Sequence, residues 1–274
     1  MQVLVANLDD GRDDTGDGDD GLVAADENNH YAGVSTNYHT AFFYSGEYEA
    51  WQQQNILSRL KLGPANRLVD IGGGTGRFAS LLYAAASLEH DALCVDPSPD
   101  MLSEAAKLPG IKSLCQGGLE FATGTDAGGY DRVLLKEVVH HLKHDELTRM
   151  FGGLWSKLPI GGVCLVCTRP QIVDYPFFQA ALEVWSQQQP AMEYYEELLS
   201  GLGFVVTAEV AEYPASLNRD WWLEMVGNRF WSTFSHFSDE DLAAGIQEIR
   251  AEHEASETIS FTEKMVFITA TKPC

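Results

Sequence analysis

The residues with the clearest chemical meaning form a glycine-rich turn after the short apolar run Leu68–Ile71. The run contains an acid, Asp70, and a helical pattern begins at Phe78, so the stretch is predicted to be a strand, a tight loop and a helix. Glycines permit positive φ and let the backbone approach a ligand without an intervening Cβ. The loop is therefore predicted to bind a ligand with a cation near the turn. Its glycines are Gly72, Gly73, Gly74 and Gly76.

The spacing of these glycines differs from the dinucleotide-binding fingerprint G-x-G-x-x-G. That fingerprint needs a glycine at position 77, where Arg77 stands. A carboxylate two residues ahead of the loop would also face a pyrophosphate. The loop therefore disfavours NAD, and an NAD-linked oxidoreductase is the least favoured of the functions considered.

A second acid, Asp96, ends the next apolar run, Ala92–Asp96. A carboxylate at the end of a strand is the usual partner of a ribose diol in doubly wound sheets. The loop and this acid together resemble the S-adenosylmethionine-dependent methyltransferases with the seven-stranded Rossmann-like (class I) fold. The resemblance runs from about Tyr38 to the C-terminus. It implies S-adenosylmethionine as cofactor and S-adenosylhomocysteine as product.

The resemblance also implies which residues bind the cofactor. The family often has an acid for the adenine amino group after its third strand, but Gly118 stands at the matching position. Backbone groups near Gly118 and Leu119 are expected to take that role. Besides the loop and Asp70, the expected cofactor-binding residues lie after the second, third and fourth strands: Asp96, Pro97, Met101, Gly118, Leu119 and Lys136.

The end of the fourth predicted strand, Tyr130–Leu135, is where the resemblance places the methyl acceptor. Lys136, Glu137 and His140 follow this strand. A histidine with a pKa near neutral can take a proton from a hydroxyl or amine acceptor. His140 and Glu137 are therefore the candidate catalytic residues, whereas His141 is interpreted as structural.

Candidate acceptor-binding residues come from an N-terminal lid, from the end of the strand Val163–Thr168 and from an insertion before the last strand. An arginine at a strand end can bind a carboxylate in a bidentate manner or pair with a surface acid. The tryptophans of the insertion can contact the acceptor or pack the insertion against the core. The candidates are Tyr38, His39, Arg169, Tyr175, Trp222 and Arg229.

The alternation of apolar runs and helical patterns predicts an α/β fold, and the resemblance implies a doubly wound, three-layer, seven-stranded sheet that is parallel except for its last strand. Domain boundaries are expected to give an acidic disordered tail at 1–30 and a methyltransferase domain at 31–274, with a lid at 31–63 and an inserted cap at 211–257. The expected elements besides those above are helices Glu47–Leu60, Ser98–Leu108, Asp145–Leu158, Phe177–Gln188 and Met192–Leu199, and strands Ile111–Cys115, Phe204–Val210 and Thr258–Thr271.

Composition limits the partners. A formal net charge of −22 over 274 residues opposes binding to nucleic acid. No apolar run reaches the roughly 20 residues of a membrane span, and the N-terminus lacks a signal-peptide pattern, so a cytoplasmic location without membrane association is expected. The oligomeric state is not indicated.

Neither a metal nor a disulfide is expected. The acidic N-terminal run has spacing near that of a calcium loop, but Ala24 occupies the position of the last ligand. The chain has five cysteines. Cys164 and Cys167 lie on one predicted strand with side chains on opposite faces, which excludes a shared zinc or redox role.

The favoured function is methyl transfer to an O, N or S nucleophile of a small molecule, such as a carboxylic, phenolic or methylthio compound. The alternative is a non-catalytic or regulatory S-adenosylmethionine-binding protein that retains the methyltransferase fold. A damaged loop would be its signature. Because Asp70, the glycines and Asp96 are all present, the enzyme is favoured.

Overall fold

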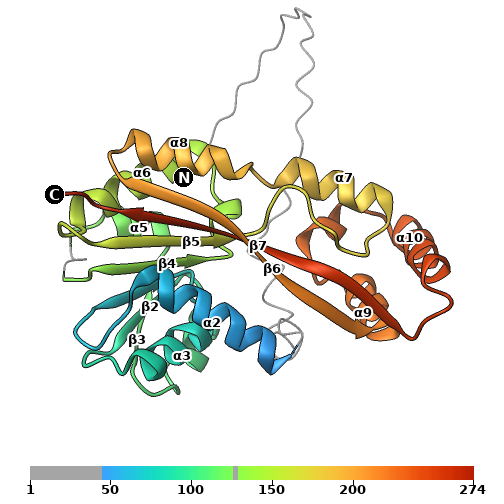
Figure 1. Cartoon of the computed structure of the whole chain (residues 1–274), viewed down its shortest axis with the longest axis horizontal. Coiled ribbons are helices and arrows are strands. Elements are labelled where there is room, and N and C mark those ends of the chain that lie inside the picture. The colour runs from blue at the N-terminus through green and yellow to red at the C-terminus, as the bar shows by residue number, and fades with distance from the viewer. Residues whose placement is uncertain (1–44, 126–128) are drawn as a thin grey trace, which may run out of the picture. The chain divides into compact units, whose positions relative to one another are not determined.

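The computed structural model describes residues 45–125 and 129–274, and a seven-stranded sheet of order β3-β2-β1-β4-β5-β7-β6 forms its centre (Figure 1). Strands β1 to β5 are parallel, and β7 runs antiparallel to both of its neighbours. This confirms the predicted fold class. The strands are β1 (Leu68–Ile71), β2 (Ala92–Asp96), β3 (Ile111–Cys115), β4 (Arg132–Lys136), β5 (Val163–Thr168), β6 (Val205–Asn218) and β7 (Thr258–Thr271).

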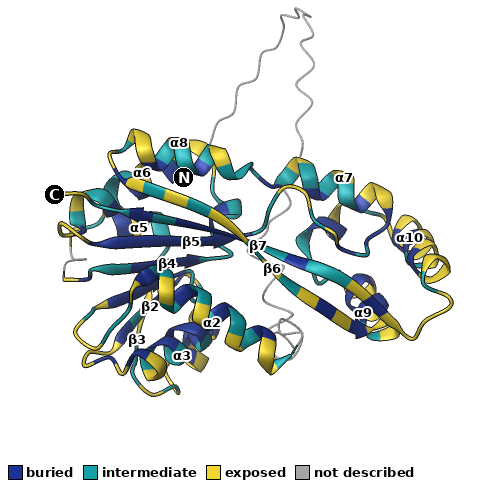
Figure 2. Ribbon diagram, viewed as in Figure 1, coloured by how far each residue is buried: buried dark blue, intermediate teal, exposed yellow. Residues whose placement is uncertain are grey.

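Helices cover both faces of the sheet, because side chains of successive strand residues point to opposite sides. One layer contains α2 and α3, and the other contains α5, α6 and α8. Figure 2 shows β5 buried along its length. The helices are α2 (Gly46–Leu60), α3 (Arg77–Ala86), α4 (Pro99–Ala105), α5 (Gly118–Thr123), α6 (His144–Lys157), α7 (Gln179–Gln188), α8 (Met192–Gly201), α9 (Arg219–Gly227) and α10 (Asp239–Glu252), with short 3-10 turns η2 (Val139–His141) and η3 (Ser232–His236).

The two cysteines of β5 follow this alternation. Cys164 packs in the core under α6 and α8, and Cys167 packs in the core under α2 and α3. Both are free thiols. The predicted placement on opposite faces is confirmed.

Strand β6 is longer than the predicted Phe204–Val210. It continues to Asn218 because β7 pairs with it over its whole length, from Val205 opposite Thr271 to Asn218 opposite Thr258. Residues 211–218, which the sequence placed in the insertion, are therefore part of the sheet. In Figure 1 this hairpin runs on past β5 toward α9.

The segment beyond the hairpin has its own hydrophobic core. The cap consists here of residues 173–185 and 219–257, and its core is almost entirely aromatic and aliphatic. Phe177 and Phe178 enter this core from an extended segment, so α7 begins at Gln179 rather than at the predicted Phe177. The core includes Tyr175, Phe177, Phe178, Trp185, Trp222 and Phe234.

Two helices, α4 and α10, begin after a serine whose side chain caps the first turn. The hydroxyl of Ser98 accepts a hydrogen bond from the amide of Met101, and that of Ser238 accepts one from the amide of Asp241. These side chains satisfy amides that have no partner inside the helix. Both serines are N-caps, and the helix that follows Ser98 ends at Ala105, before the predicted Leu108.

Two adjacent glycines of α6 allow a matched test of the packing of α6 against α5. A Cβ at Gly153 would lie 2.3 Å from the carbonyl oxygen of Ala122 in α5, whereas a Cβ at Gly152 meets only Leu202 at 4.0 Å. Replacing a helical glycine by alanine favours the helix by about 1 kcal/mol where space allows. We expect Gly152→Ala to raise the melting temperature and Gly153→Ala to lower it. Equal shifts in thermal denaturation would contradict the α5–α6 contact.

Candidate functional site

The glycine loop leaves β1 at the edge of the sheet where the parallel strands end. The amides of Gly72 and Gly73 both donate to the carbonyl of Val95 in β2, at 2.7 and 3.2 Å. Gly72 has φ of +71°, and a Cβ there would lie 2.3 Å from a methyl of Val138. Gly74 has φ of +55° and open space at its Cβ position. The hydrogen bonds to Val95 and the close contact at Gly72 thus fix the loop against its neighbours. The space beside Gly74 is open.

Asp96 ties this loop to the start of α4. One carboxylate oxygen accepts from the amide of Gly74 and the other accepts from the amide of Ser98, both at 2.9 Å. Burial raises the pKa of Asp96, although these two amides oppose the rise. A carboxylate offers about four lone-pair positions, so Asp96 keeps acceptor capacity for two hydroxyls.

Asp70 lies almost fully buried under the loop. Its burial raises the pKa to about 7, while Lys136 opposes the rise and Asp96 adds to it. Burial lowers the pKa of Lys136, which the charges of Glu137 and Asp70 counteract. The ammonium of Lys136 also lies 4.6 Å from the ring centre of Phe78 in α3. A cation bound beside Asp70 would stabilise its ionised form.

At the ends of β4 and β5 a buried ion network replaces the predicted free arginine. The Nε of Arg169 donates to Glu137 at 2.7 Å, and its Nη1 donates to the hydroxyl of Tyr48 in α2 at 3.2 Å. Arg169 also forms an ion pair with Glu263 of β7. Arg169 therefore binds two carboxylates of the protein itself, which contradicts its predicted availability to an acidic acceptor.

Glu137 has an uncommon backbone conformation. Its φ is +56°, and its amide donates to the carbonyl of Cys167 at 2.8 Å. Burial alone would raise the pKa of Glu137, but Arg169 and Lys136 outweigh it and hold the pKa below its ordinary value. A non-glycine residue at positive φ is kept only where its surroundings fix it, and such residues concentrate at functional sites.

His140 lies in η2 with Nδ1 buried and without a hydrogen-bond partner among the described residues. Burial and the neighbouring His141 lower the pKa of His140 to about 4, against the opposing effect of Glu137. The expected near-neutral pKa is therefore wrong, because the imidazolium would lose its hydration. At pH 7 the ring is neutral and can accept a proton.

The three predicted acceptor residues of the cap region serve other contacts. Trp222 is fully buried in the cap core, where its Nε1–H donates to the carbonyl of Pro176 at 2.9 Å. Arg229 pairs with Asp239 at 2.8 Å within the cap. Tyr175 is buried and donates its hydroxyl to Glu263 at 2.8 Å. These positions contradict direct acceptor contacts for Trp222 and Arg229 and bring Tyr175 to the ion network instead.

Of the remaining expected residues, some are described by the structure and others lie outside the described residues. Pro97 is exposed after β2, Met101 is buried in α4, and Leu119 packs against the core from α5. Gly118 opens α5, where a Cβ would lie 2.7 Å from Ile71. Tyr38 and His39, with the acidic tail, lie outside the described residues.

Sequence reasoning missed Glu263 and Tyr48. Glu263 is fully buried on the face of β7 that also carries Met265 and Phe267. The available signal was that Glu263 occupies the same alternating positions of the strand as the apolar residues Met265 and Phe267. Because charged residues are almost never fully buried unless paired, an acid at such a position indicates a buried ion pair. Tyr48 gave no comparable signal, because an aromatic residue on a helix face indicates packing.

Other features of the described residues do not form a second site. A cavity of about 360 Å³ lies at the opposite edge of the sheet, lined by residues that include Arg67, His90 and Lys112, away from the loop. Within ranges 45–125 and 129–274, no three side chains gather as metal ligands. No helix in these ranges has the length and apolar character required to cross a bilayer.

Comparison with known proteins agrees with this geometry. Residues 69–164 match the family model described as a methyltransferase domain, and these residues contain the loop, Asp96, Glu137 and His140. A search of curated proteins found no significant match to the chain. Residues 69–164 are therefore similar in sequence to a methyltransferase domain.

Solved structures support the fold. The YcgJ protein of Bacillus subtilis matches with a TM-score of 0.56 and 12% identity, over 81% of this chain and 98% of that one. Cyclopropane synthase MmaA2 of Mycobacterium tuberculosis matches with 0.54 and 18%, over 82% and 85%. Phosphoethanolamine N-methyltransferase 2 of Haemonchus contortus, solved with S-adenosylmethionine, matches with 0.51 and 21%, over 81% and 52%. At these identities the likeness establishes the fold alone.

The buried carboxylate of Asp70 gives a pH-dependent prediction for stability. Because the folded pKa of about 7 exceeds the usual value of 3.8, the folded state binds more protons between these values, and Asp70 destabilises the protein as pH rises through this window. We expect Asp70→Asn to raise the melting temperature, more at pH 8 than at pH 5. Thermal denaturation at both pH values measures the difference. A pH-independent effect would contradict a buried, raised pKa.

Proposed function

We propose that the protein is an S-adenosylmethionine-dependent methyltransferase that acts on a small-molecule acceptor. The observation that carries the proposal is the glycine loop beside Asp96, at the crevice where the strand order reverses between β1 and β4. Ligands of open α/β sheets bind at this crevice. The net charge of −22 favours a small acceptor over nucleic acid.

The residues present fit this cofactor. The open space at Gly74 leaves room for a ligand against the backbone, and Asp96 retains lone pairs for a ribose diol. Asp70 offers a buried negative charge to a cationic amino group under the loop. When bound, the cofactor supplies an electrophilic methyl group on a sulfonium. Pro97, Met101, Gly118, Leu119 and Lys136 are proposed to line the rest of its site.

The protein's own groups then serve the acceptor. Alignment of the nucleophile and exclusion of water can supply about 7–11 kcal/mol of the barrier reduction. The neutral His140 ring can take a proton from an O–H or N–H acceptor at Nδ1, and the adjacent negative charge of Glu137 stabilises the imidazolium. Tyr38 and His39, which lie outside the described residues, are proposed to contact the acceptor.

Asp96 provides the direct test of cofactor binding. We expect Asp96→Asn to weaken S-adenosylmethionine and S-adenosylhomocysteine binding at least about tenfold, because an amide replaces an anionic acceptor of two hydroxyls. Isothermal titration measures both constants. The control is Asp91→Asn, which removes a charge next to the opposite end of β2, where Asp91 pairs loosely with Lys112. Equal affinities in both variants would exclude the proposed ribose contact.

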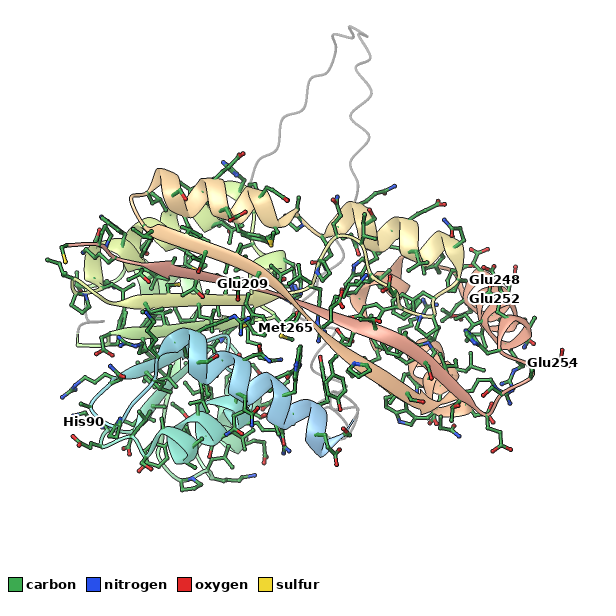
Figure 3. All side chains as sticks on the ribbon, viewed as in Figure 1. His90, Glu209, Glu248, Glu252, Glu254 and Met265 are labelled. Atoms are coloured by element: carbon green, nitrogen blue, oxygen red, sulfur yellow. The ribbon has the colours of Figure 1, made fainter. Side chains whose placement is uncertain are left out.

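His140 provides a test of the chemistry. We expect His140→Ala to lower kcat by about 10²–10⁴ if the acceptor carries a proton, and high pH to restore part of the loss. Protonation of His140 should not limit the wild-type rate above about pH 6, since the pKa of His140 is about 4. His90→Ala is the control, because exposed His90 lies at the other edge of the sheet (Figure 3). Unchanged kcat in His140→Ala would point to an acceptor without a proton, such as a thioether.

A further inference from the structure

Glu263 is a buried acid that the proposed methyl transfer does not use directly. Its side chain is fully buried on β7, two residues before Met265, which Figure 3 labels. It forms an ion pair with Arg169 and accepts a hydrogen bond from Tyr175 at 2.8 Å. An isolated carboxylate at such a position would be strongly unfavourable, so its charge is maintained by Arg169.

The guanidinium of Arg169 is already bound by carboxylates of the protein. Its guanidinium binds Glu137 on one side and Glu263 on the other, and only 10% of its side chain is exposed. One cation thus faces two anions, and the triad carries a net negative charge. An acidic acceptor would have to displace a protein carboxylate to reach Arg169.

The surrounding charges do not reverse this balance. The positive charge of Lys136 interacts with the negative charges of Glu137 and Asp70, and Arg229 is paired with Asp239 inside the cap. Three carboxylates, Asp70, Glu137 and Glu263, therefore face the two cations Arg169 and Lys136, and this end of the crevice is negative when all three are ionised.

We infer that Glu263 is a specificity-determining residue that neutralises Arg169 and so selects a small amine, rather than a carboxylic acid, as the methyl acceptor. The inference rests on the proposed function and narrows its acceptor class. Complementary charge favours a cationic ligand, and like charge disfavours an anionic one. Glu263 acts through Arg169 and Glu137, so it need not touch the acceptor.

The reaction balances with the groups present. The ammonium form of the acceptor loses one proton to solvent before the methyl transfer, because an imidazole with a pKa of about 4 is too weak a base to hold the proton of an ammonium. The freed nitrogen lone pair forms the new N–C bond as the C–S bond breaks, and the electron pair of that bond stays on sulfur. The product is a methylated ammonium with a neutral thioether.

Binding of charge-matched ligands tests the inference without knowledge of the natural acceptor. The probes are butylamine, hexylamine and 2-phenylethylamine, each with the carboxylic acid and the alcohol of the same carbon skeleton. Each is titrated into the full-length protein saturated with S-adenosylhomocysteine, by calorimetry and by thermal shift. We expect the best amine to bind at least about tenfold more tightly than its matched acid. Amines that bind no better than their acids overturn the inference.

The variant Glu263→Gln changes the charge and keeps the shape. We expect it to weaken amine binding about tenfold and to strengthen acid binding, because Arg169 then faces one carboxylate instead of two and the triad loses its net negative charge. The control is Glu252→Gln, which removes one charge from the exposed end of α10, far along the cap in Figure 3. An unchanged amine-to-acid ratio in a folded Glu263→Gln protein contradicts the role of Glu263.

Two outcomes separate this inference from the proposed function. If the wild-type protein binds neither S-adenosylmethionine nor S-adenosylhomocysteine, the proposed function fails. If it binds both and prefers acids, only the amine inference fails. Should Glu263→Gln not fold, as judged by circular dichroism and its melting temperature, the wild-type comparison of amines with acids still decides.

Discussion

The ion pair of Arg169 with two carboxylates is the interaction on which the site depends. It joins residues that follow β4 and β5 to a residue of β7, and hydrogen bonds extend it to Tyr48 of α2 and to Tyr175 beside the cap. Removing one partner of such a buried pair costs about 3–5 kcal/mol, because the other charge is left without compensation. The guanidinium of Arg169 therefore joins α2, the sheet and, through Glu263, the segment that contains Tyr175.

This network and the glycine loop divide the crevice into two parts with different physical character. The loop is held by backbone amides that donate to Val95 and Asp96, so its shape is preformed and offers acceptors for hydroxyls. The other part is held by side-chain charges around Arg169, and its selectivity follows from how those charges cancel. A single substitution can alter the second part without moving the first.

The fold could be predicted from local patterns because its signals lie within short stretches. Apolar runs of four to six residues gave β1, β2 and β5, and a helical pattern after Ser98 gave the start of α4. The glycine spacing gave the loop. The extension of β6 to Asn218 was not predictable in this way, because its residues are half exposed and become a strand only through pairing with β7. Tertiary contact, rather than local preference, sets such boundaries.

The acceptor residues were the least predictable part, since their roles depend on partners distant in sequence. Arg169 looked like a free cation because Glu263, its partner, lies 94 residues later. For Trp222 the sequence left acceptor contact and packing of the cap as alternatives, and the cap core, in which Trp222 is buried, supports packing. The methyltransferase-domain match ends at residue 164, before Arg169, Tyr175 and Glu263. The part of the chain that is similar in sequence to a methyltransferase domain therefore holds the glycine loop, and the part beyond it carries the charges that we propose set the choice of acceptor.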